Sequence, residues 1–496
     1  LGQLLKSVKP EHKKIFAQGI SFDSRNIKKS DIFFAITGNK TSGIKFVQDA
    51  IFKGASAIIS EKKIKYKKFS IPMVQVKNVR KSLSEACSNF YKKKPKNIIA
   101  VTGTNGKSSV VNFFYQILKF NKVPVASIGT LGIISENYKK KINLTTIDPI
   151  SLNRNLQILA KQNVNNVILE ASSHGLNQNR LYGLKFDIGI FTNLSRDHLD
   201  YHKTFQNYYN SKLILFKKLM KKNAVAIYDA QLNSASKLKR IAKSNKIKTF
   251  TMGGNYSSVS VISHQFLKNE QKVTFKINNN EYVFSTKLIG RVQIKNLLMA
   301  IMAAMKSKIS LEKILKVTRN IKPVNGRLEK IGNLYNNGIV ILDYAHTPDA
   351  LEKALAVLRE LTAQRLICVF GCGGDRDARK RSPMGQAVGR LADVAVLTND
   401  NPRTEDPQAI VDAVVPGLRE AGMAEAPLGE EDGYRIELDR MRAIELAVRA
   451  AGPGDAVLIA GKGHEDYQII GDEVRHFDDR ETARRILEMR RTEALM

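Results

Sequence analysis

A glycine-rich loop that carries a lysine and two hydroxyl groups follows a run of apolar residues. It reads Val101-Thr-Gly-Thr-Asn-Gly-Lys-Ser-Ser109, between Asn97-Ile-Ile-Ala100 and an apolar-periodic segment from Val110 to Leu118. Backbone N–H groups at a helix start bind phosphate, a lysine adds charge, and a serine hydroxyl can reach Mg²⁺. The pattern predicts ATP binding. Val101 replaces the first glycine of the longer GxxxxGK[ST] motif, but the flanking strand and helix disfavour a chance turn.

A carboxylate ends a second apolar run. Glu170 follows Val167-Ile-Leu and precedes Ala-Ser-Ser-His174. At a strand end opposite a phosphate loop, a carboxylate suits Mg²⁺, which prefers oxygen donors. The alternative is that Ser172 or Ser173 caps a helix and Glu170 is incidental. The residues themselves leave both interpretations open.

Two histidines follow the apolar run Ile188-Gly-Ile-Phe-Thr192. His198 and His202 are four residues apart, a spacing that would suit a metal on one helix face. A glutamate does not lie between them as in HExxH, so a zinc protease is disfavoured. Lys212 comes ten residues later, in a lysine-rich region where a lone lysine is ordinarily a surface residue.

Two further charged residues, Arg327 and Asp343, are candidates for nucleotide binding. Arg327 ends Val324-Asn-Gly-Arg, and Asp343 begins Asp-Tyr-Ala-His346 before Pro348. Asp343 at a strand end could hold a ribose, and Arg327 could balance phosphate charge. A domain-linking turn and a helix cap are the alternatives.

Three polar clusters in the last third each follow an apolar strand. They are Gly371-Cys-Gly-Gly-Asp-Arg376, Thr398-Asn-Asp-Asn-Pro-Arg403 and Gly461-Lys-Gly-His-Glu465. The carboxyl ends of parallel strands meet at one sheet edge, so we expect one crevice. Arginines, acids and an amide together suit a ligand that bears both carboxylate and ammonium groups.

The elements that position these clusters predict an α/β protein of three domains. Residues 1–95 read as a small α/β domain, with strands at Asp31–Ile36 and Ala55–Ile59, a helix at Phe46–Phe52 and a linker at Lys92–Lys96. Residues 96–329 alternate strand and helix, as a doubly wound parallel sheet of the P-loop type does. Residues 330–496 form a Rossmann-like α/β domain, with strands expected at Ile339–Leu342, Leu366–Phe370, Val394–Leu397 and Ala456–Ile459.

Composition narrows the function classes. The 496 residues contain no apolar run long enough for a transmembrane helix, and we expect no secretory signal at Leu1–Lys14. The cysteines, Cys87, Cys368 and Cys372, suit neither a disulfide framework nor a zinc site. We therefore expect a protein of the reducing cytoplasm, without membrane insertion. We also expect a monomer.

The net charge of +34 raises the alternative of a nucleic-acid-binding P-loop ATPase. Acidic residues outnumber basic ones from Lys353 onward, so the excess lies in residues 1–352 as scattered lysines. Without a clustered nucleic-acid motif, we expect no nucleic-acid partner. The abrupt change of composition near Ala350 fits codon bias or a hybrid of two related genes, a hypothesis that the nucleotide composition of the gene would test.

Taken in order, these motifs resemble the Mur ligase family of ATP-dependent amide-bond-forming enzymes over nearly the whole chain. The Gly103–Ser109 loop is shared with folylpolyglutamate synthetases. Asp400-Asn-Pro-Arg403 with Gly461–Glu465 is more specific, and resembles the branch that adds meso-diaminopimelate to UDP-N-acetylmuramoyl-L-Ala-D-Glu in peptidoglycan synthesis. An L-lysine-adding sibling is the nearest alternative, and an inactive binding protein the least favoured.

The resemblance implies a role for each matching position. Catalysis would involve Lys107, Glu170, His198 and Lys212. ATP would contact Gly103, Thr104, Asn105, Gly106, Lys107, Ser108, Ser109, Asn296, Arg327 and Asp343. Mg²⁺ would lie near Ser108, Glu170, His198 and Lys212, the last carboxylated on its amine. The UDP substrate would contact Phe22, Ser24, Asn39, Lys40, Thr41, Thr145, Thr146, Ser172, Gln178 and Arg180. The amino acid would contact Arg376, Asp400, Asn401, Pro402, Arg403, Gly461 and Glu465.

The implied reaction passes the γ-phosphoryl group of ATP to the substrate carboxylate, and an amine then attacks the acyl phosphate. Lys107 and Mg²⁺ would offset the repulsion between the two anions. Because an acyl phosphate hydrolyses in water, we expect the third domain to close over the central one.

Overall fold

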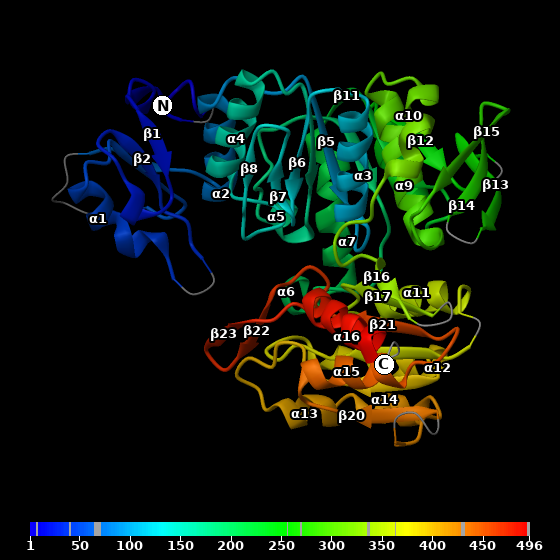
Figure 1. The fold of residues 1–496 in the computed structure, drawn as a ribbon. Coiled ribbons are helices and arrows are strands. Elements are labelled where there is room, and N and C mark those ends of the chain that lie inside the picture. The colour runs from blue at the N-terminus through cyan, green and yellow to red at the C-terminus, as the bar shows by residue number, and fades with distance from the viewer. Residues whose placement is uncertain are drawn as a thin grey trace.

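The computed structural model describes residues 1–496 apart from 6–7, 39–40, 64–70, 255, 268–269, 335–337, 363, 428–431 and 494–496. It forms α/β domains in the order that the sequence predicts (Figure 1). The N-terminal and central domains lie side by side, and the C-terminal domain lies beneath them in this view. Within the described residues, a helix with the length and apolarity to cross a bilayer is not found.

The N-terminal domain is built on a parallel sheet of order β1-β2-β3-β4. Its strands are β1 (Gly19–Ser21), β2 (Asp31–Phe34), β3 (Ala57–Ser60) and β4 (Met73–Gln75), with helices α1 (Val47–Phe52) and α2 (Val79–Phe90). The expected strands and helix are thus confirmed within a few residues. Helix α2 joins this domain to the central one, because Ser84 and Ser88 donate hydrogen bonds to the carbonyls of Asn179 and Gly183.

The central sheet has the order β15-β14-β13-β12-β11-β10-β5-β9-β6-β7-β8. Its middle is parallel, as expected, and consists of β5 (Asn97–Thr102), β6 (Val125–Gly129), β9 (Asn166–Glu170), β10 (Phe186–Phe191), β11 (Met220–Asp229) and β12 (Lys248–Met252). Both edges depart from the expected parallel pattern. They are antiparallel ribbons made of β7 (Gly132–Ile134) and β8 (Lys139–Lys140), and of β13 (Val259–Phe266), β14 (Gln271–Ile277) and β15 (Asn280–Thr286).

The antiparallel edge formed by β13, β14 and β15 contains a turn signal in the sequence. An interpretation based on alternating strands and helices does not detect it. Asn278 and Asn279 adopt positive φ between β14 and β15, a conformation that asparagine tolerates in tight turns. Strand β14 alternates buried and half-exposed or exposed residues, as expected for a sheet that faces the core on one side.

Helices cover both faces of the central sheet. Helix α3 (Lys107–Phe120) begins at the end of β5 and buries Val110, Phe113 and Ile117 beside α9 (Arg291–Lys306). The other helices are α4 (Pro149–Lys161), α5 (Ser173–Asn177), α6 (Leu199–His202), α7 (Phe205–Ile214), α8 (Ala235–Ser244) and α10 (Leu311–Val317). Helix α7 continues into a π-helical turn over Leu215–Leu219.

The C-terminal sheet has the order β16-β17-β21-β18-β19-β20. Its strands are β16 (Glu329–Asn333), β17 (Ile339–Asp343), β18 (Leu366–Phe370), β19 (Val394–Leu397), β20 (Gly433–Ile436) and β21 (Ala456–Ala460), and β16 alone is antiparallel to its neighbour. The four strands expected here are confirmed. A hairpin of β22 (Tyr467–Ile470) and β23 (Glu473–His476) projects from this domain.

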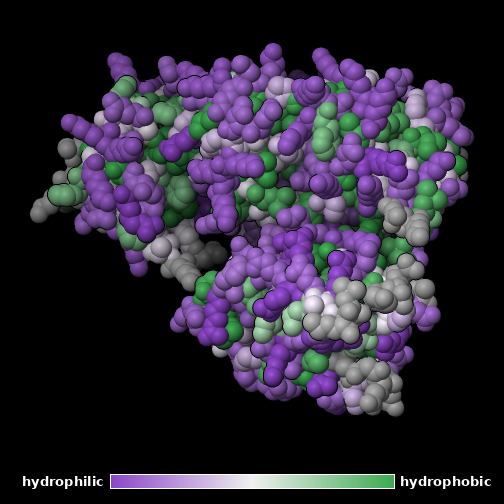
Figure 2. All heavy atoms as spheres, in the orientation of Figure 1, coloured by the Kyte–Doolittle hydropathy of each residue, from purple (hydrophilic) through white to green (hydrophobic). Residues whose placement is uncertain are grey.

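The helices of this domain are α11 (Pro348–Arg359), α12 (Arg381–Leu391), α13 (Pro407–Asp412), α14 (Val415–Glu420), α15 (Arg440–Ala450) and α16 (Asp479–Glu493). The composition change near Ala350 falls in the first turn of α11. Arg440 and Asp479, both fully buried, form an ion pair at 2.7 Å that joins α15 to α16. Figure 2 shows that hydrophilic side chains cover most of the visible surface, with a recess between the upper domains and the C-terminal domain.

Candidate active site

The phosphate loop requires glycine at two positions. Gly103 has a φ of +145°, and a Cβ there would lie 1.9 Å from Oγ1 of Thr192. Gly106 has a φ of +82° as the N-cap of α3, and its Cβ would lie 2.5 Å from Oδ1 of Asn296. These contacts bring the loop, the end of β10 and helix α9 together, and they leave the first N–H groups of α3 at the head of the sheet.

Lys107 folds back over this loop. Its Nζ donates hydrogen bonds to the carbonyls of Gly103 at 3.0 Å and Thr104 at 2.7 Å. Burial lowers the pKa of Lys107, and the carboxylate of Glu170 partly offsets that effect. The Lys107 amine therefore lies directly beside the helix start, where an anion would be held.

Glu170 is 2% exposed at the end of β9. Ser108 Oγ lies 3.0 Å from both of its carboxylate oxygens, and the backbone N–H of Thr130 donates to it at 2.8 Å. Ser172 also caps α5, since its Oγ accepts from Gly175 N. The helix cap that was one alternative is therefore confirmed, and the Glu170 carboxylate also contacts the phosphate-loop serine. The role of Glu170 toward Mg²⁺ stays a prediction.

Lys212 is not the surface residue that its surroundings in the sequence favoured. It is 1% exposed on α7, its Nζ lies 4.3 Å from the ring centre of Tyr208, and it donates a 2.6 Å hydrogen bond to the carbonyl of Gly103. Burial lowers the pKa of Lys212 well below its ordinary value. Helix α7 thus places an amine under the phosphate loop.

The expectation that His198 and His202 share one helix face is wrong. His198 precedes α6 with a left-handed φ of 54°, so the helical spacing does not apply to it. His202 is buried, and its Nε2 lies 3.0 Å from the hydroxyl of Ser173. Across the described parts of the chain, His, Cys, Asp and Glu side chains form no metal-holding group of three or more.

The oxygen donors nevertheless fit an ion that is partly held by nucleotide phosphates. Ser108 and Glu170 offer a hydroxyl and a carboxylate at the mouth of the phosphate loop, and these are the ligand types that Mg²⁺ takes. His198 lies next to Asp197, with 3.4 Å between Nε2 and Oδ2.

Arg327 and Asp343 link the central and C-terminal domains. Asp343 Oδ2 accepts a 2.7 Å hydrogen bond from Leu328 N, and burial raises the pKa of this carboxyl to about 6. The guanidinium of Arg327 lies 4.3 Å from the ring centre of Tyr344. The segment that holds Arg327 is therefore a domain-linking turn, one of the two alternatives that the sequence offered. The other alternative was a helix cap, and Thr347 caps α11.

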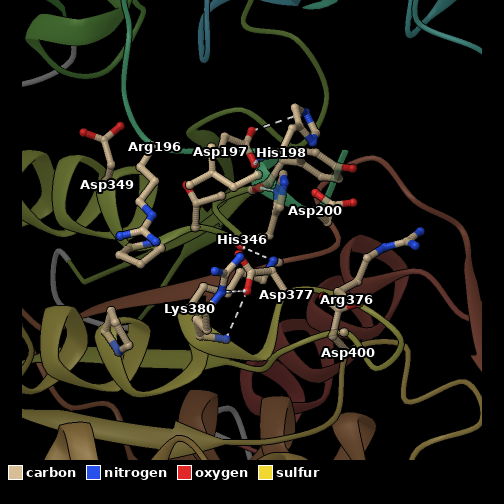
Figure 3. A pocket seen from close by; sticks show the side chains of 18 of the residues that line it. Arg196, Asp197, His198, Asp200, His346, Asp349, Arg376, Asp377, Lys380 and Asp400 are labelled. Atoms are coloured by element: carbon tan, nitrogen blue, oxygen red, sulfur yellow. Dashed lines mark hydrogen bonds and ion pairs between the residues drawn. The ribbon is translucent and has the colours of Figure 1, made fainter. Parts of the chain in front are cut away.

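A cavity of about 740 Å³ lies between the central and C-terminal domains (Figure 3). The three polar clusters of the C-terminal domain converge on it, as the sequence predicts. From the central domain it is lined by His174, Arg196, Asp197, His198, Leu199 and Asp200; from the C-terminal domain, by residues that include Tyr344, His346, Asp349, Arg376, Lys380, Asp400, Asn401, Arg403, Gly461 and Glu465.

The loop from Asp400 to Arg403 is held rigidly in this cavity wall. Asn401 Oδ1 accepts hydrogen bonds from Lys462 Nζ at 3.2 Å and Ile469 N at 2.9 Å, and its Nδ2 donates to Glu465 at 3.2 Å. Arg403 has a φ of 54° and donates to the carbonyl of Gly374 at 2.7 Å.

Two acidic side chains, Asp400 and Glu465, lie close together in this wall. Burial, assisted by neighbouring Asp400, raises the pKa of Glu465. Gly461 approaches Asp400 so closely that a Cβ would lie 2.7 Å from its Oδ2. Pro402 belongs to the Asp400–Arg403 loop, whereas Arg376 lies in the loop after β18 and extends along the cavity in Figure 3.

The expected UDP-substrate residues form a separate group. Thr146 links this group to the end of β9, because its Oγ1 donates to the carbonyl of Glu170 and accepts from Ser172 N. Arg180 donates to the side chain of Gln178 and to the carbonyl of Thr146. Thr145 contacts Thr130, with 3.3 Å between their hydroxyls.

The remaining expected UDP contacts are in the N-terminal domain. Phe22 is 38% exposed, and Ser24 is buried at the start of a 3₁₀ turn. Thr41 is described, whereas Asn39 and Lys40 lie outside the described residues. None of these described residues lines the 740 Å³ cavity.

Several residues of the cavity wall were not singled out from the sequence. Asp197, His346, Asp349 and Lys380 all line it. His346 and Asp349 follow the end of β17, and Asp197 follows the end of β10. Their position after parallel strands was the available signal, since such loops gather at one edge of a sheet.

The fold and this site define a three-domain α/β enzyme of the phosphate-loop class. Family models match each domain: "Mur ligase family, catalytic domain" over residues 17–91, "Mur ligase middle domain" over 101–304, and "Mur ligase, glutamate ligase domain" over 326–463. The chain belongs to the Mur ligase family.

Full-length relatives agree. A UDP-N-acetylmuramoyl-L-alanyl-D-glutamate--2,6-diaminopimelate ligase of Rickettsia montanensis is 40% identical over 492 residues, covering 98% of each chain. One of the same name from Clostridium tetani is 40% identical over 481 residues, covering 96% of each. A solved structure with that name is 32% identical, with a TM-score of 0.67 over 96% of this chain and 95% of that one.

A folylpolyglutamate synthase of Mycobacterium tuberculosis shares the fold alone. It is 17% identical, with a TM-score of 0.60 over 77% of this chain and 92% of that chain.

Proposed function

We propose that this protein is an ATP-dependent ligase that joins meso-diaminopimelate to the γ-carboxylate of D-Glu in UDP-N-acetylmuramoyl-L-Ala-D-Glu. The observation that carries the proposal is the cavity in which the Asp400–Arg403 loop and Glu465 face residues of the phosphate-loop domain. The names of the full-length relatives support it. The reaction would supply peptidoglycan precursors, and the enzyme would act as a cytoplasmic monomer.

Three functional domains follow from this proposal. Residues 1–95 would bind the UDP end of the substrate, residues 96–329 would bind ATP, and residues 330–496 would bind the amino acid.

ATP would be held by the phosphate loop and by three residues around it. The N–H groups of residues 103–109 and the Lys107 ammonium would face the phosphates. Asn296, which lies against Gly106, and Arg327, which lies against Tyr344, would also contact the nucleotide. Asp343 would complete this group at the end of β17.

Mg²⁺, held by Ser108 and Glu170 with His198 and Lys212 nearby, would supply positive charge between the nucleotide and the substrate carboxylate. The buried amine of Lys212 suits carboxylation, because the neutral form that burial favours is the one that adds CO₂, with loss of a proton, to give a carbamate. The carbamate would offer oxygen donors that an ammonium group lacks.

The UDP substrate would extend from the N-terminal domain to the phosphate loop. Phe22, Ser24, Asn39, Lys40 and Thr41 would contact its uridine end. Its other end would reach the hydrogen-bonded group that consists of Thr145, Thr146, Ser172, Gln178 and Arg180.

The amino-acid ligand has two carboxylates and two ammonium groups, and the cavity wall offers partners for both. Arg376 and Arg403 suit the carboxylates, since a guanidinium binds carboxylate through two N–H groups. Asp400 and Glu465 suit ammonium groups, and Asn401, Pro402 and Gly461 shape the wall between them. Lysine lacks the second carboxylate and would leave an arginine unpaired.

The chain's own groups account for the transfer. Lys107 offsets the repulsion as the substrate carboxylate attacks the γ-phosphorus and ADP leaves. The amine then attacks the carbonyl carbon of the acyl phosphate, loses a proton, and phosphate leaves. Closure of the C-terminal domain would exclude water from the acyl phosphate.

The test is phosphate release from ATP and Mg²⁺ with the UDP-muramoyl dipeptide, comparing meso-diaminopimelate with L-lysine. Release that requires both the dipeptide and meso-diaminopimelate is expected. Release with lysine would assign the sibling activity. Release stimulated by DNA or RNA, with binding that weakens steeply in salt, would instead favour the nucleic-acid alternative.

A further inference from the structure

Asp349 joins the central and C-terminal domains through a single carboxylate oxygen. It is the second residue of α11, and its Oδ2 accepts hydrogen bonds from Asn105 Nδ2 at 3.1 Å and Ser195 Oγ at 2.8 Å. Lys353, one turn along α11, pairs with the same carboxylate at 2.7 Å. Asn105 belongs to the phosphate loop and Ser195 follows β10, so two loops of the central domain meet on one residue of the C-terminal domain.

Asn105, the phosphate-loop partner of Asp349, is held to the central domain through its main chain. Asn105 N donates to Asn193 Oδ1 at 2.9 Å, and Thr192 Oγ1 donates to the carbonyl of Asn105 at 2.6 Å. The main chain of Asn105 is thus tied to the central domain, while its side-chain amide reaches the C-terminal domain.

On the other side, Asp349 lies in the first turn of α11, directly after a loop that forms part of the cavity wall. Tyr344, His346 and Thr347 lie in this loop between β17 and α11, and all three line the cavity. Lys380 Nζ donates to the carbonyl of His346 at 3.0 Å, which carries the connection on to a further cavity residue. A shift of Asp349 relative to the phosphate loop therefore moves this wall.

We propose that Asp349 is a positioning residue that fixes the cavity wall of the C-terminal domain against the phosphate loop. This inference rests on the proposed function: the acyl phosphate forms at the loop, and the attacking amine is held by the opposite wall. Asp349 is not a phosphate ligand, because two anions repel. Lys353 offsets its charge, so the carboxylate can lie beside the loop.

Three variants separate this role from a general defect in α11. Asp349→Leu removes the acceptor with little change of volume, and Asp349→Asn keeps one oxygen for Asn105 and Ser195. Glu352→Leu is the matched control: it removes a carboxylate from the same helix and the same cavity wall, but its partner, Arg390, belongs to its own domain.

For turnover, we expect Asp349→Leu to lower kcat about 100-fold, the scale of a misplaced reacting group, and to change the Kd of ATP less than about 3-fold. Asp349→Asn should stay within about 5-fold of wild-type kcat. Adding Ser195→Ala to Asp349→Leu should cost little more than Asp349→Leu alone, since Asp349→Leu already removes the hydrogen bond that Ser195 Oγ donates.

Hydrogen–deuterium exchange gives a readout that does not depend on activity. Peptides that cover residues 103–109 and 343–351 should exchange faster in Asp349→Leu, and at the wild-type rate in Asp349→Asn and Glu352→Leu. Unchanged exchange in Asp349→Leu, or equal changes in Glu352→Leu, would overturn the proposal. A wild-type protein that forms no amide product would overturn the proposed function, while exchange would still decide whether Asp349 joins the domains.

Discussion

Lys212 Nζ donates a hydrogen bond to the carbonyl of Gly103 at 2.6 Å, and this contact ties helix α7 to the phosphate loop from below. The same amine lies over the ring of Tyr208, whose hydroxyl is 2.9 Å from that of Thr104. Two side chains from one helix thus support adjacent residues of the loop. Any change of charge on Lys212 is felt directly at the place where phosphate would bind.

Removal of the Lys212 amine should abolish most of the activity. We expect Lys212→Met to lower kcat about 10²–10³-fold, the scale for loss of one charged group at a transition state. Lys217→Met, an exposed lysine in the π-helical turn, is the control and should keep wild-type kcat. Mass spectrometry of the intact protein under CO₂ should detect one carbamate in wild type and none in Lys212→Met. Equal kcat in the two variants would contradict the assigned role.

Replacement of Arg403 should alter amino-acid selectivity more than ATP use. We expect Arg403→Ala to lower kcat/KM for meso-diaminopimelate about 100-fold, because a buried carboxylate loses its partner. The KM of ATP should stay within about 2-fold. Steady-state assays with both amino acids would measure the change, and a parallel loss for lysine and meso-diaminopimelate would argue against a selectivity role.

Gly103→Ala should remove ATP binding. The new Cβ would meet Thr192 Oγ1 at 1.9 Å, at a φ of +145° that side chains rarely adopt. Calorimetry should show an affinity for ATP reduced at least about 30-fold. Gly422→Ala is the matched control, since its φ is +92° but nothing lies within 4 Å of the added Cβ. It should cost about 1 kcal/mol of stability and leave ATP affinity intact.

The protein should lose thermal stability as the pH falls from 6.5 towards 4. Burial lowers the pKa of His202 and of His464 to about 4 in the folded state, whereas an unfolded histidine titrates near its ordinary value. Between these values the unfolded chain binds more protons, so stability rises with pH across that window and is fully present above it. His202→Gln should flatten the dependence of Tm on pH by a few degrees. An unchanged slope in this variant would show that His202 does not contribute.

Local sequence was sufficient to predict the buried strands and the phosphate loop. The apolar runs before Gly103, Glu170 and Asp400 are buried parallel strands, because a strand covered on both faces is apolar throughout. The antiparallel edges of the central sheet were missed. Asn278-Asn279 carried a turn signal, but an alternation of strands and helices does not predict that β14 and β15 pair with each other.

The histidine pair shows where spacing misleads. A separation of four residues implies one helix face only if both residues are helical, and His198 has a left-handed backbone. Lys212 shows the converse. Its surroundings are rich in lysine, yet it is buried because α7 packs beneath the loop.

The sequence by itself determined the types of residue that could do chemistry and the strands that end beside them, since both depend on short-range pattern. It also determined that Gly103-Thr-Asn-Gly-Lys-Ser forms a phosphate loop, because this conformation is encoded by neighbouring residues. Only the tertiary structure decided which partners those residues meet. The bond between Asp349 and Asn105, 244 positions apart, and the burial of Lys212 against Gly103 depend on how domains and helices dock, and docking is set by packing over the whole chain rather than by local preference.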